Sequence, residues 1–409
     1  MAQDARADLV VIGAGTIGGW ASVFAAEDGL KVVTLERGLV GQGASSRAAG
    51  IVRAQGGTPP TVALGRWSID FYRSPHARYE IDSGFRELGY LILAVTEDDV
   101  RAARERIGMQ QAEGLDVRWV DAADVPALTQ GTMVAEGHRG GTYRDGDGHI
   151  DPPRNVLAYT AAMRQVGVDL RERTPATGLR FERTADGRRR VTGVETADGV
   201  IATERVLLTG GPTLRAVGDL AGLRIPAGAV RHTVAVSEPH EAFDQAQPMV
   251  FDIAAGLYWR LEEGGLLWGF SNEADPPGIA REIDWPFVER MRERLASFVP
   301  VTRDLAIRRI WAATIDYTPD HLPILGPATE PDGTAIDGLS IASAGGHGMM
   351  WGPGVARIAA DVIVRGTTDL TDTTDLGLAR FDEHGHSRLA TDPIALPFPV
   401  DAAPVSAPG

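Results

Sequence analysis

Short apolar runs and helical stretches alternate at the start of the chain. Residues 8–12, Asp-Leu-Val-Val-Ile, are mostly apolar, which predicts a buried parallel strand. Residues 16–28 have the composition of a helix, and a second apolar run at 31–35 predicts another strand. The order strand, helix, strand is typical of a βαβ unit in a parallel sheet.

Three glycines, Gly13, Gly15 and Gly18, connect the first strand to the helix in G-x-G-x-x-G spacing. The first allows a tight turn, the second lets a pyrophosphate approach the backbone, and the third lets helix and strand pack closely. The helix N-terminus offers unpaired N–H groups to a phosphate. Glu36, which ends the second strand, can accept hydrogen bonds from ribose hydroxyls. These features predict a dinucleotide site without specifying the dinucleotide.

Two later apolar runs also end in glycine. Residues 206–208 lead into Gly210 and Gly211, and residues 339–343 lead into Gly345. We therefore expect one Rossmann-type domain assembled from separated segments. Its segments are 1–80, 150–215 and 306–375.

Between these segments the pattern changes to one that predicts the strands of a second, antiparallel sheet. Residues 81–149 and 216–305 predict an inserted antiparallel-sheet domain that binds the substrate, so the fold class is α/β and α+β. Residues 376–409 are expected to be a C-terminal tail. From Asp392 onward this tail is rich in proline and alanine, which predicts partial disorder.

Composition narrows the class of protein. The 409 residues suffice for two domains, and the formal charge of −15 disfavours nucleic acid or an anionic membrane as partner. No apolar run approaches about 18 residues, so we expect no transmembrane segment. Residues 1–8 lack the apolar region of a secretory signal, which predicts a cytoplasmic protein.

The absence of cysteine excludes disulfides, thiolate metal sites and thiol redox chemistry. The nine histidines show no metal-ligand spacing, so no metal site is expected. Lys31 is the single lysine, and arginine provides the other 39 positive charges.

Several segments together resemble the FAD-dependent amino acid and secondary amine oxidoreductases, a family that includes sarcosine oxidases, glycine oxidase and D-amino acid oxidases. The similarity extends over roughly residues 7 to 365. The segments that carry it are 10–18 with Glu36-Arg37, 43–50, the T-P-D-x-x-P-x-x-G sequence at 318–326, and 344–350.

The resemblance implies FAD as cofactor and assigns its contacts residue by residue. The pyrophosphate and adenosine side is assigned to Gly13, Gly15, Thr16, Ile17, Gly18, Glu36, Arg37, Ala176, Gly210 and Gly211. The ribityl and flavin side is assigned to Ser45, Ser46, Arg47, Ala49, Gly50, Gly345, Gly346, His347, Gly348 and Met349.

Three positions depart from relatives in this family. Relatives that link flavin covalently use a cysteine where about Ala313 stands or a histidine where Arg47 stands, so the resemblance implies non-covalent FAD. Oxidases of the sarcosine type place a lysine over the flavin, and the matching position here is Leu267. The electron acceptor, oxygen or another molecule, therefore stays open.

Candidate catalytic residues follow from the chemistry of amine oxidation, in which a neutral amine delivers hydride while its carboxylate is held. Arginine matches a carboxylate in geometry and stays charged, and Arg53 occupies the position of the family's carboxylate-binding arginine. Tyr258 and Arg260 share one face of a predicted strand, and glycine flanks His347. The alternatives are a surface arginine, a packed tyrosine and a loop histidine bonded to backbone.

Other polar residues have weaker claims to a catalytic role. His232, His321 and Tyr317 rank below His347 as candidates. Asp316 and Asp320 are expected to fix loop geometry rather than act as bases.

The function expected from these residues is FAD-dependent oxidation of the C–N bond of an amino acid or N-alkyl amino acid, sarcosine-like or of D configuration, to an imine. One alternative is a flavin-dependent dehydrogenase of 2-hydroxy acids or polyols. Another is the flavin subunit of a hetero-oligomeric dehydrogenase, and a homo-oligomer is also open.

Overall fold

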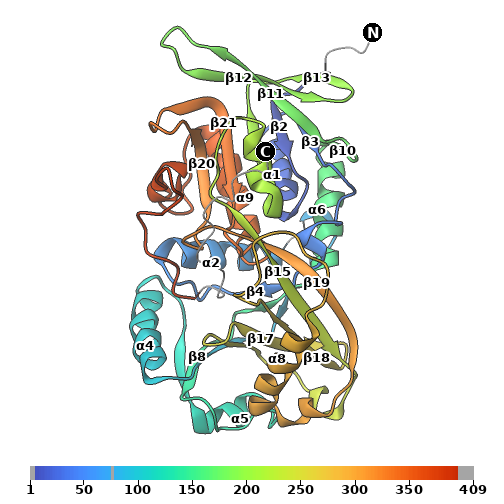
Figure 1. Cartoon of the computed structure of the whole chain (residues 1–409), viewed down its shortest axis with the longest axis vertical. Helices are drawn as coiled ribbons and strands as arrows, with labels where there is room; N and C mark the ends of the chain where they lie inside the picture. Colours follow the sequence, from blue (N-terminus) through green and yellow to red (C-terminus); the bar gives the residue numbers. More distant parts are fainter. Residues whose placement is uncertain (1–4, 75–77, 395–409) are drawn as a thin grey trace.

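The computed structural model describes residues 5–74 and 78–394, which are built around two large sheets (Figure 1). The first sheet has ten strands, with parallel strands at its centre. Val10 pairs with Val206 on one side and with Val33 on the other, so both neighbours lie in parallel register. The central strands in spatial order are β21 (Ala335–Ser343), β14 (Val206–Leu208), β2 (Leu9–Ile12), β3 (Val32–Leu35) and β10 (Asp169–Arg171).

Shorter strands extend this sheet at its edges. The antiparallel hairpin of β11 (Ala176–Arg183) and β12 (Arg189–Thr196) projects from one end of the molecule, at the top of Figure 1. The remaining members are β13 (Gly199–Ala202), β1 (Ala5–Arg6) and β20 (Ile324–Thr329).

Strand β2 is buried on both faces, which explains its continuous apolar sequence. Leu9 and Val11 pack in one hydrophobic cluster with the helices, whereas Val10 and Ile12 pack in a second cluster on the opposite face. Trp20 of α1 and Trp351, which precedes α9, lie in the first cluster and are fully buried. The helices of this half are α1 (Thr16–Glu27), α2 (Pro59–Arg73), α6 (Pro152–Gln165), α7 (Leu214–Asp219) and α9 (Gly352–Arg365).

The second sheet has eight strands and forms the lower half of Figure 1. All neighbouring strands are antiparallel except the parallel pair β16 and β6. In spatial order they are β19 (Ile307–Tyr317), β15 (Gly228–Ser237), β18 (Gly265–Phe270), β17 (Leu257–Glu262), β16 (Met249–Asp252), β6 (Tyr90–Ala94), β8 (Gly140–Arg144) and β7 (Arg118–Asp121).

A separate hydrophobic cluster forms the core of this half, with Trp259, Trp268 and Phe298 among its members. Three helices belong to this half, α4 (Glu97–Ala112), α5 (Val125–Leu128) and α8 (Trp285–Phe298). A small third sheet contains β4 (Ile51–Val52), β9 (Gly148–His149) and β5 (Arg86–Glu87).

The expected fold class is confirmed, since a parallel nucleotide-binding-type sheet built from separated segments accompanies a largely antiparallel sheet. One segment boundary differs. Residues 306–375 were assigned to the nucleotide-binding domain, but β19 pairs with β15 along ten registered positions and so belongs to the eight-stranded sheet. Local sequence could not show this pairing, because it depends on a strand far away in the chain.

The expected tail also differs from the structure. Residues 376–394 contain two short 3-10 helices, η6 (Thr374–Leu376, at its start) and η7 (Leu378–Arg380), and bury Leu376, Leu378, Arg380, Asp392 and Ile394. Residues 395–409, the rest of the segment expected to be disordered, lie outside the described residues.

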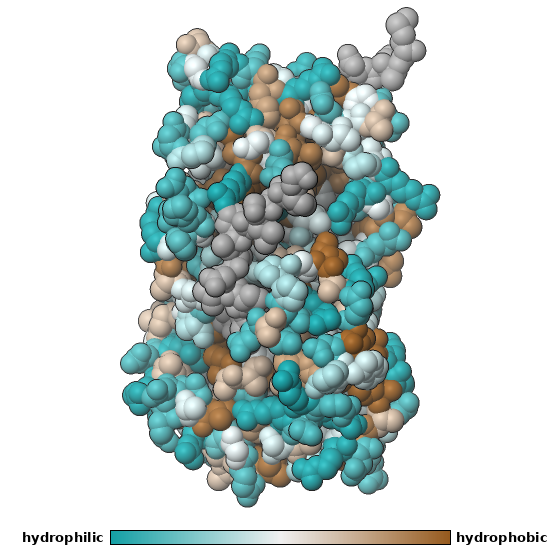
Figure 2. Space-filling view, viewed as in Figure 1, coloured by the Kyte–Doolittle hydropathy of each residue, from teal (hydrophilic) through white to brown (hydrophobic). Residues whose placement is uncertain are grey.

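Polar and charged side chains cover most of the face shown in Figure 2, and hydrophobic side chains gather there in separate patches. Among the described residues, no helix is long and apolar enough to cross a membrane.

Candidate functional site

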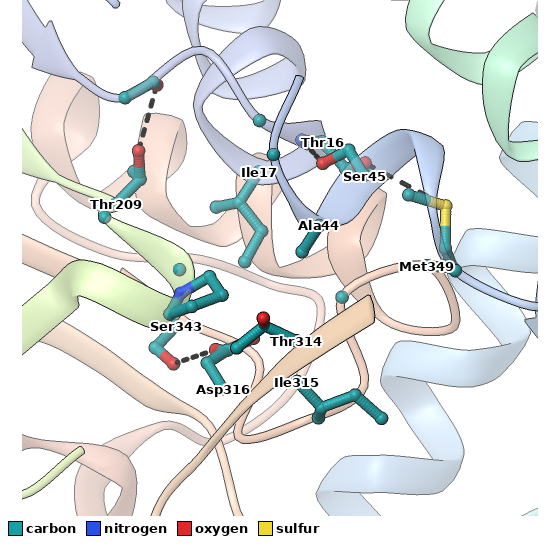
Figure 3. Close-up of a pocket in the computed structure, with 18 of the residues that line it drawn as sticks. Thr16, Ile17, Ala44, Ser45, Thr209, Thr314, Ile315, Asp316, Ser343 and Met349 are labelled. Carbon is teal, nitrogen blue, oxygen red and sulfur yellow. Dashed lines mark hydrogen bonds between the residues drawn. The ribbon is translucent and has the colours of Figure 1, made fainter. Parts of the chain in front are cut away.

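A cavity of about 420 Å³ lies where the two sheets meet. Its lining includes the ends of β2 and β3, the residues after β14, and strands β15, β17 and β19 of the second sheet. The carboxyl ends of parallel strands form a crevice where ligands bind in open α/β sheets. Figure 3 shows the part of the cavity between Thr16 and Ser45 on one side and Thr314 and Asp316 on the other.

The glycine turn can place its backbone at this cavity because its glycines have no side chains that would clash with neighbouring atoms. Gly13 has φ of +103°, and a Cβ there would lie 2.9 Å from Thr209 Oγ1. A Cβ at Gly18 would lie 1.9 Å from the Gly13 carbonyl oxygen, so only glycine allows helix α1 to approach β2 this closely. Thr209 also donates to the carbonyl oxygens of Ile12 at 2.9 Å and Gly13 at 3.1 Å, which fixes the turn.

Helix α1 presents its N-terminus to the cavity. The Thr16 N–H donates to Ser45 Oγ at 3.0 Å. Within the part of the chain that the structure describes, the N–H groups of Ile17 and Gly18 have no protein acceptor. Such free groups and the helix dipole favour a bound phosphate.

Glu36 lies on the same side of the cavity, at the end of β3. Its Oε2 accepts the Ala14 N–H at 3.1 Å and its Oε1 accepts the Gly38 N–H at 2.9 Å. Each carboxylate oxygen has a further lone pair, so ribose hydroxyls can still donate to this side chain.

The 345–350 loop, between β21 and α9, forms the opposite wall of the cavity. Contacts from helices α2 and α6 hold this loop in place. Tyr72 of α2 donates to the Met349 carbonyl at 2.9 Å. Asn155 of α6 donates to Thr16 Oγ1 at 3.3 Å and to the Met349 sulfur at 3.7 Å. The start of α1 and the 345–350 loop are therefore fixed relative to one another through α6.

His347 in this loop is buried, and its ring lies 4.0 Å from the Trp351 ring, centroid to centroid. Burial, and secondarily the positive charge of Arg53, hold the pKa of His347 well below its usual value, so the imidazole is neutral. Its buried Nδ1 has no hydrogen-bond partner among the described residues. Buried polar atoms usually have a hydrogen-bond partner, and because His347 lines the cavity, a ligand bound there is one candidate partner.

Arg53 lies at the end of the cavity formed with Tyr90, Phe251 and Tyr258. Its side chain is buried, with only 2% of the residue exposed. Its guanidinium donates to the carbonyl oxygens of Gln55 and Ile394. Among the described residues no carboxylate lies within ion-pair distance of Arg53.

Tyr258 and His232 form a buried polar pair on the second sheet. The Tyr258 hydroxyl lies 2.5 Å from His232 Nε2, and His232 Nδ1 lies 2.8 Å from Ser271 Oγ. Burial lowers the pKa of His232 to about 3 and raises the pKa of the Tyr258 phenol. Both groups are therefore neutral near pH 7, and both line the cavity.

Asp316 adds an acidic group from β19. Ser343 Oγ donates to its Oδ2 at 3.3 Å, as Figure 3 shows. Burial raises the pKa of the Asp316 carboxyl. The adjacent Thr314 has a buried hydroxyl without a partner among the described residues and also lines the cavity.

The structure brings most of the predicted site residues to this cavity. Those that line it are Gly13, Gly15, Thr16, Ile17, Glu36, Arg37, Ser45, Ala49, Gly50, Arg53, Ala176, Gly210, Gly211, Tyr258, Gly346, His347, Gly348 and Met349.

Five predicted residues do not line the cavity, namely Gly18, Ser46, Arg47, Arg260 and Gly345. Arg260 donates through Nε to the Ala49 carbonyl at 2.8 Å and forms an ion pair with Glu262, so it supports the cavity wall. Alternation along β17 predicts that Arg260 faces the cavity together with Tyr258. Its guanidinium instead contacts the Ala49 carbonyl and the Glu262 carboxylate. Ser46 donates to the Gly41 carbonyl instead of facing the cavity.

Sequence reasoning gave three cavity residues minor roles or none. His232 pairs with Tyr258 only because β15 and β17 flank β18, which no motif reveals. Asp316 lines the cavity, whereas Asp320 does fix local geometry through Arg380. Ile394 comes from the segment expected to be a tail.

Comparison with known proteins identifies the class. The model of the family described as "FAD dependent oxidoreductase" matches residues 8–362, so the chain belongs to this family. The expected family and the expected FAD dependence are confirmed by this match.

Several characterised relatives are similar in sequence. The chain is 28% identical to human mitochondrial dimethylglycine dehydrogenase over 389 residues, which cover 88% of this chain and 43% of that protein. It is 25% identical to the sarcosine oxidase subunit beta of Rhodobacter capsulatus, with 92% of this chain and 89% of that subunit covered. The chain thus spans less than half the length of the dehydrogenase but most of the subunit.

Solved structures share the fold. The L-proline dehydrogenase of P. horikoshii superposes with a TM-score of 0.83 at 22% identity, covering 92% of this chain and 98% of that chain. The glycine oxidase of Geobacillus kaustophilus gives a TM-score of 0.78 at 24% identity, covering 92% and 99%.

The residues present fit FAD. The glycine turn leaves room for a pyrophosphate where a Cβ at Gly15 would meet only Ser45 Oγ, at 3.2 Å. Thr16 and Ile17 at the start of α1, Glu36 and His347 all line one cavity. Phosphate, ribose and flavin thus each have a group of suitable chemistry.

Gly15→Val should weaken FAD binding without unfolding the protein. The Gly15 backbone is extended, which any residue adopts, so the valine side chain would project into the space for pyrophosphate. Binding should weaken at least about tenfold, measured by titration of apoprotein with FAD. Gly108→Val in α4, where a Cβ meets nothing within 4 Å, is the control, and normal FAD affinity in Gly15→Val would remove this residue from the site.

Stability should fall as the pH is lowered below about 6.5. Burial lowers the pKa of His149 to about 3, with Arg260 and Arg86 adding to the effect, and lowers that of His321 to about 4. Between these values and the ordinary value of about 6.5, the unfolded state binds more protons, so unfolding is favoured as pH falls.

Urea unfolding measured between pH 7 and pH 4 tests this expectation. His149→Gln should reduce the slope of unfolding free energy against pH by up to about 1.4 kcal/mol per pH unit. His384→Gln, at an exposed position, is the matched control. An unchanged slope in His149→Gln would show that this histidine is not buried in its neutral form.

Proposed function

We propose that this chain catalyses FAD-dependent oxidation of the C–N bond of a small amino acid or N-alkyl amino acid, giving an imine. The observation that carries the proposal is the buried, unpaired guanidinium of Arg53 at the cavity. The buried carboxyl of Asp392 acts on the Arg53 charge without forming an ion pair with it. A buried guanidinium that no carboxylate contacts is costly, and a ligand carboxylate would supply that contact. The names of the similar proteins, which include dimethylglycine dehydrogenase and sarcosine oxidase subunit beta, support the same substrate class.

Arg53 orients the substrate by its carboxylate. The guanidinium uses two carbonyl acceptors, and its remaining N–H groups can bond a carboxylate in the cavity. Fixing this end of the substrate limits where its amine and α-carbon can lie, which lowers the entropic part of the barrier.

Tyr258 and His232 provide a hydrogen-bonding surface for the amine. The phenol can bond the amine while His232 Nε2 bonds the phenol, and Ser271 fixes the second imidazole nitrogen. Because burial disfavours the charged form of either group, neither side chain can accept the proton of an ammonium substrate. The site therefore selects the neutral amine, whose lone pair forms the C=N bond.

FAD, when bound, would accept the hydride, which carries away the two electrons of the substrate's C–H bond while the nitrogen lone pair forms the C=N bond. His347 and Met349 line the same cavity as Ala49 and Gly50, and these residues would hold the flavin and exclude water from it. Non-covalent binding is part of the proposal, since neither Ala313 nor Arg47 offers a nucleophile.

The electron acceptor is the second part of the proposal. Leu267 stands where the resemblance places the lysine of oxidases, and it is buried in a hydrophobic cluster with Ala49 and Tyr258. No ammonium group is present there to favour oxygen reduction. We propose an acceptor other than oxygen, and the likeness to a sarcosine oxidase subunit supports a hetero-oligomer as one setting.

Anaerobic bleaching of the bound flavin tests the function. Sarcosine, dimethylglycine, proline and D-alanine are compared with lactate and glycerol 3-phosphate, and absorbance near flavin's visible bands is followed in the absence of oxygen. Bleaching by an amine but not by the hydroxyl compounds is expected. Bleaching by a hydroxy acid alone would contradict amine oxidation, and a chain that binds no FAD would remove the proposal altogether.

Arg53→Met should raise KM for the amine substrate by about 10- to 100-fold while FAD content stays normal, because a charge-assisted hydrogen bond to the carboxylate is lost. Steady-state kinetics with an artificial electron acceptor measure this change. Arg281→Met is the comparison, since Arg281 also lines the cavity but is exposed. A rise in KM in Arg281→Met but not in Arg53→Met would show that Arg281, and not Arg53, binds the substrate carboxylate.

A further inference from the structure

The segment 387–394, called here the C-terminal strap, runs to the substrate end of the cavity. It is anchored at Asp320, whose carboxylate accepts Arg380 Nε at 2.7 Å and Arg380 Nη2 at 3.0 Å. The side chains of Arg380 and Asp320 are 0% and 1% exposed. Ser387 Oγ donates to the same carboxylate at 2.5 Å, and the Asp392 N–H donates to the Asp320 carbonyl at 3.0 Å.

The end of the strap turns into the cavity through a local hydrogen bond. Asp392 Oδ1 accepts the Ile394 N–H at 2.8 Å, which bends the chain around Pro393. Gly57 makes room for this turn, because a Cβ there would lie 2.3 Å from Asp392 Oδ1 and 2.7 Å from Pro393 Cδ. The Ile394 carbonyl then accepts Arg53 Nη2 at 3.1 Å.

The Ile394 side chain belongs to the wall of the cavity. Its residue is 1% exposed and packs in the hydrophobic cluster that contains Ala49, Tyr90, Phe251 and Tyr258. All five residues also line the cavity. Ile394 therefore contributes an aliphatic surface to the cavity wall in the same cluster as Tyr258, and its carbonyl accepts from the proposed carboxylate-binding Arg53.

We propose that Ile394 is a specificity-determining residue, which closes the substrate end of the cavity and limits the size of the apolar group that a substrate carries. The inference rests on the proposed amino acid substrate. Arg53 fixes the carboxylate, so the position of the rest of the substrate is determined, and groups that extend toward the strap meet the isoleucine side chain. Shortening this side chain opens space that a larger substituent fills.

The full-length, FAD-loaded Ile394→Ala variant tests the proposal with two ligand series. The first consists of N-methyl-, N-propyl- and N-benzylglycine, compared by kcat/KM. The second consists of acetate, butanoate and benzoate, compared by the dissociation constants obtained from the perturbed flavin spectrum. In the first series the ratio of kcat/KM for the large ligand to that for the small ligand should rise at least about tenfold over wild type. In the second series the same ratio of affinities should rise by a similar factor, since one methylene in a hydrophobic pocket changes affinity by about tenfold or more.

Two further variants separate cavity size from loss of folding. Ile394→Val removes one methyl group and should shift both ratios in the same direction by a smaller factor. Leu378→Ala removes a buried side chain that belongs to the same terminal region but packs in another hydrophobic cluster and does not line the cavity. Its ratios should equal those of wild type, whereas a shift equal to that of Ile394→Ala would assign the effect to general loosening.

The two series also distinguish this inference from the proposed function. If amines fail to bleach the flavin but the carboxylates still follow the expected change, the function is wrong and the role of Ile394 stands. If amines bleach the flavin and neither ratio changes in folded Ile394→Ala, the role of Ile394 is overturned. Absence of ligand binding and turnover in wild type would overturn both.

Discussion

The close contact between the first turn of α1 and the end of β2 determines where everything else at the site lies. A Cβ at Gly18 would be 1.9 Å from the Gly13 carbonyl, so the contact exists only without a side chain. It places the helix N-terminus at the edge where the central parallel strands end. Thr209, reaching from the residue after β14, bonds both Ile12 and Gly13 and locks that edge. Under the proposed function, this contact would set where the phosphates of FAD bind.

The second sheet holds the loop at 44–50, part of which lines the same cavity, through a small number of polar contacts. Arg260 of β17 bonds the Ala49 carbonyl at 2.8 Å, and Trp311 of β19 bonds the Arg47 carbonyl at 2.9 Å. The loop at 44–50 is therefore held by the largely antiparallel sheet although its residues follow the nucleotide-binding strands in sequence. This arrangement explains why predicted site residues such as Arg260 and Arg47 do not line the cavity. Their backbone or charged groups position the residues that do.

The sequence was sufficient for features in which local spacing dictates geometry. The glycine turn, the acidic residue after β3 and the glycine-ended strands were predicted because each depends on a few adjacent residues. Pairings between distant segments were not predictable in this way. His232 meets Tyr258 through the order of strands in the sheet, β19 joins β15 across the chain, and Ile394 reaches Arg53 from a segment whose composition indicated disorder. Proline-rich composition describes an isolated segment, whereas a buried ion pair at Asp320 supplies the tertiary order that composition omits.

Burial of the Arg53 charge links the proposed binding of a carboxylate to the stability of the fold. Removing this cation from water lowers the stability of the empty fold, and under the proposed function a bound carboxylate would offset that cost. A ligand at about one hundred times its dissociation constant adds about 2.7 kcal/mol to the free energy of unfolding. If Arg53 binds the substrate carboxylate as proposed, saturating substrate would therefore also make the folded chain more resistant to unfolding and to proteolysis of its open forms.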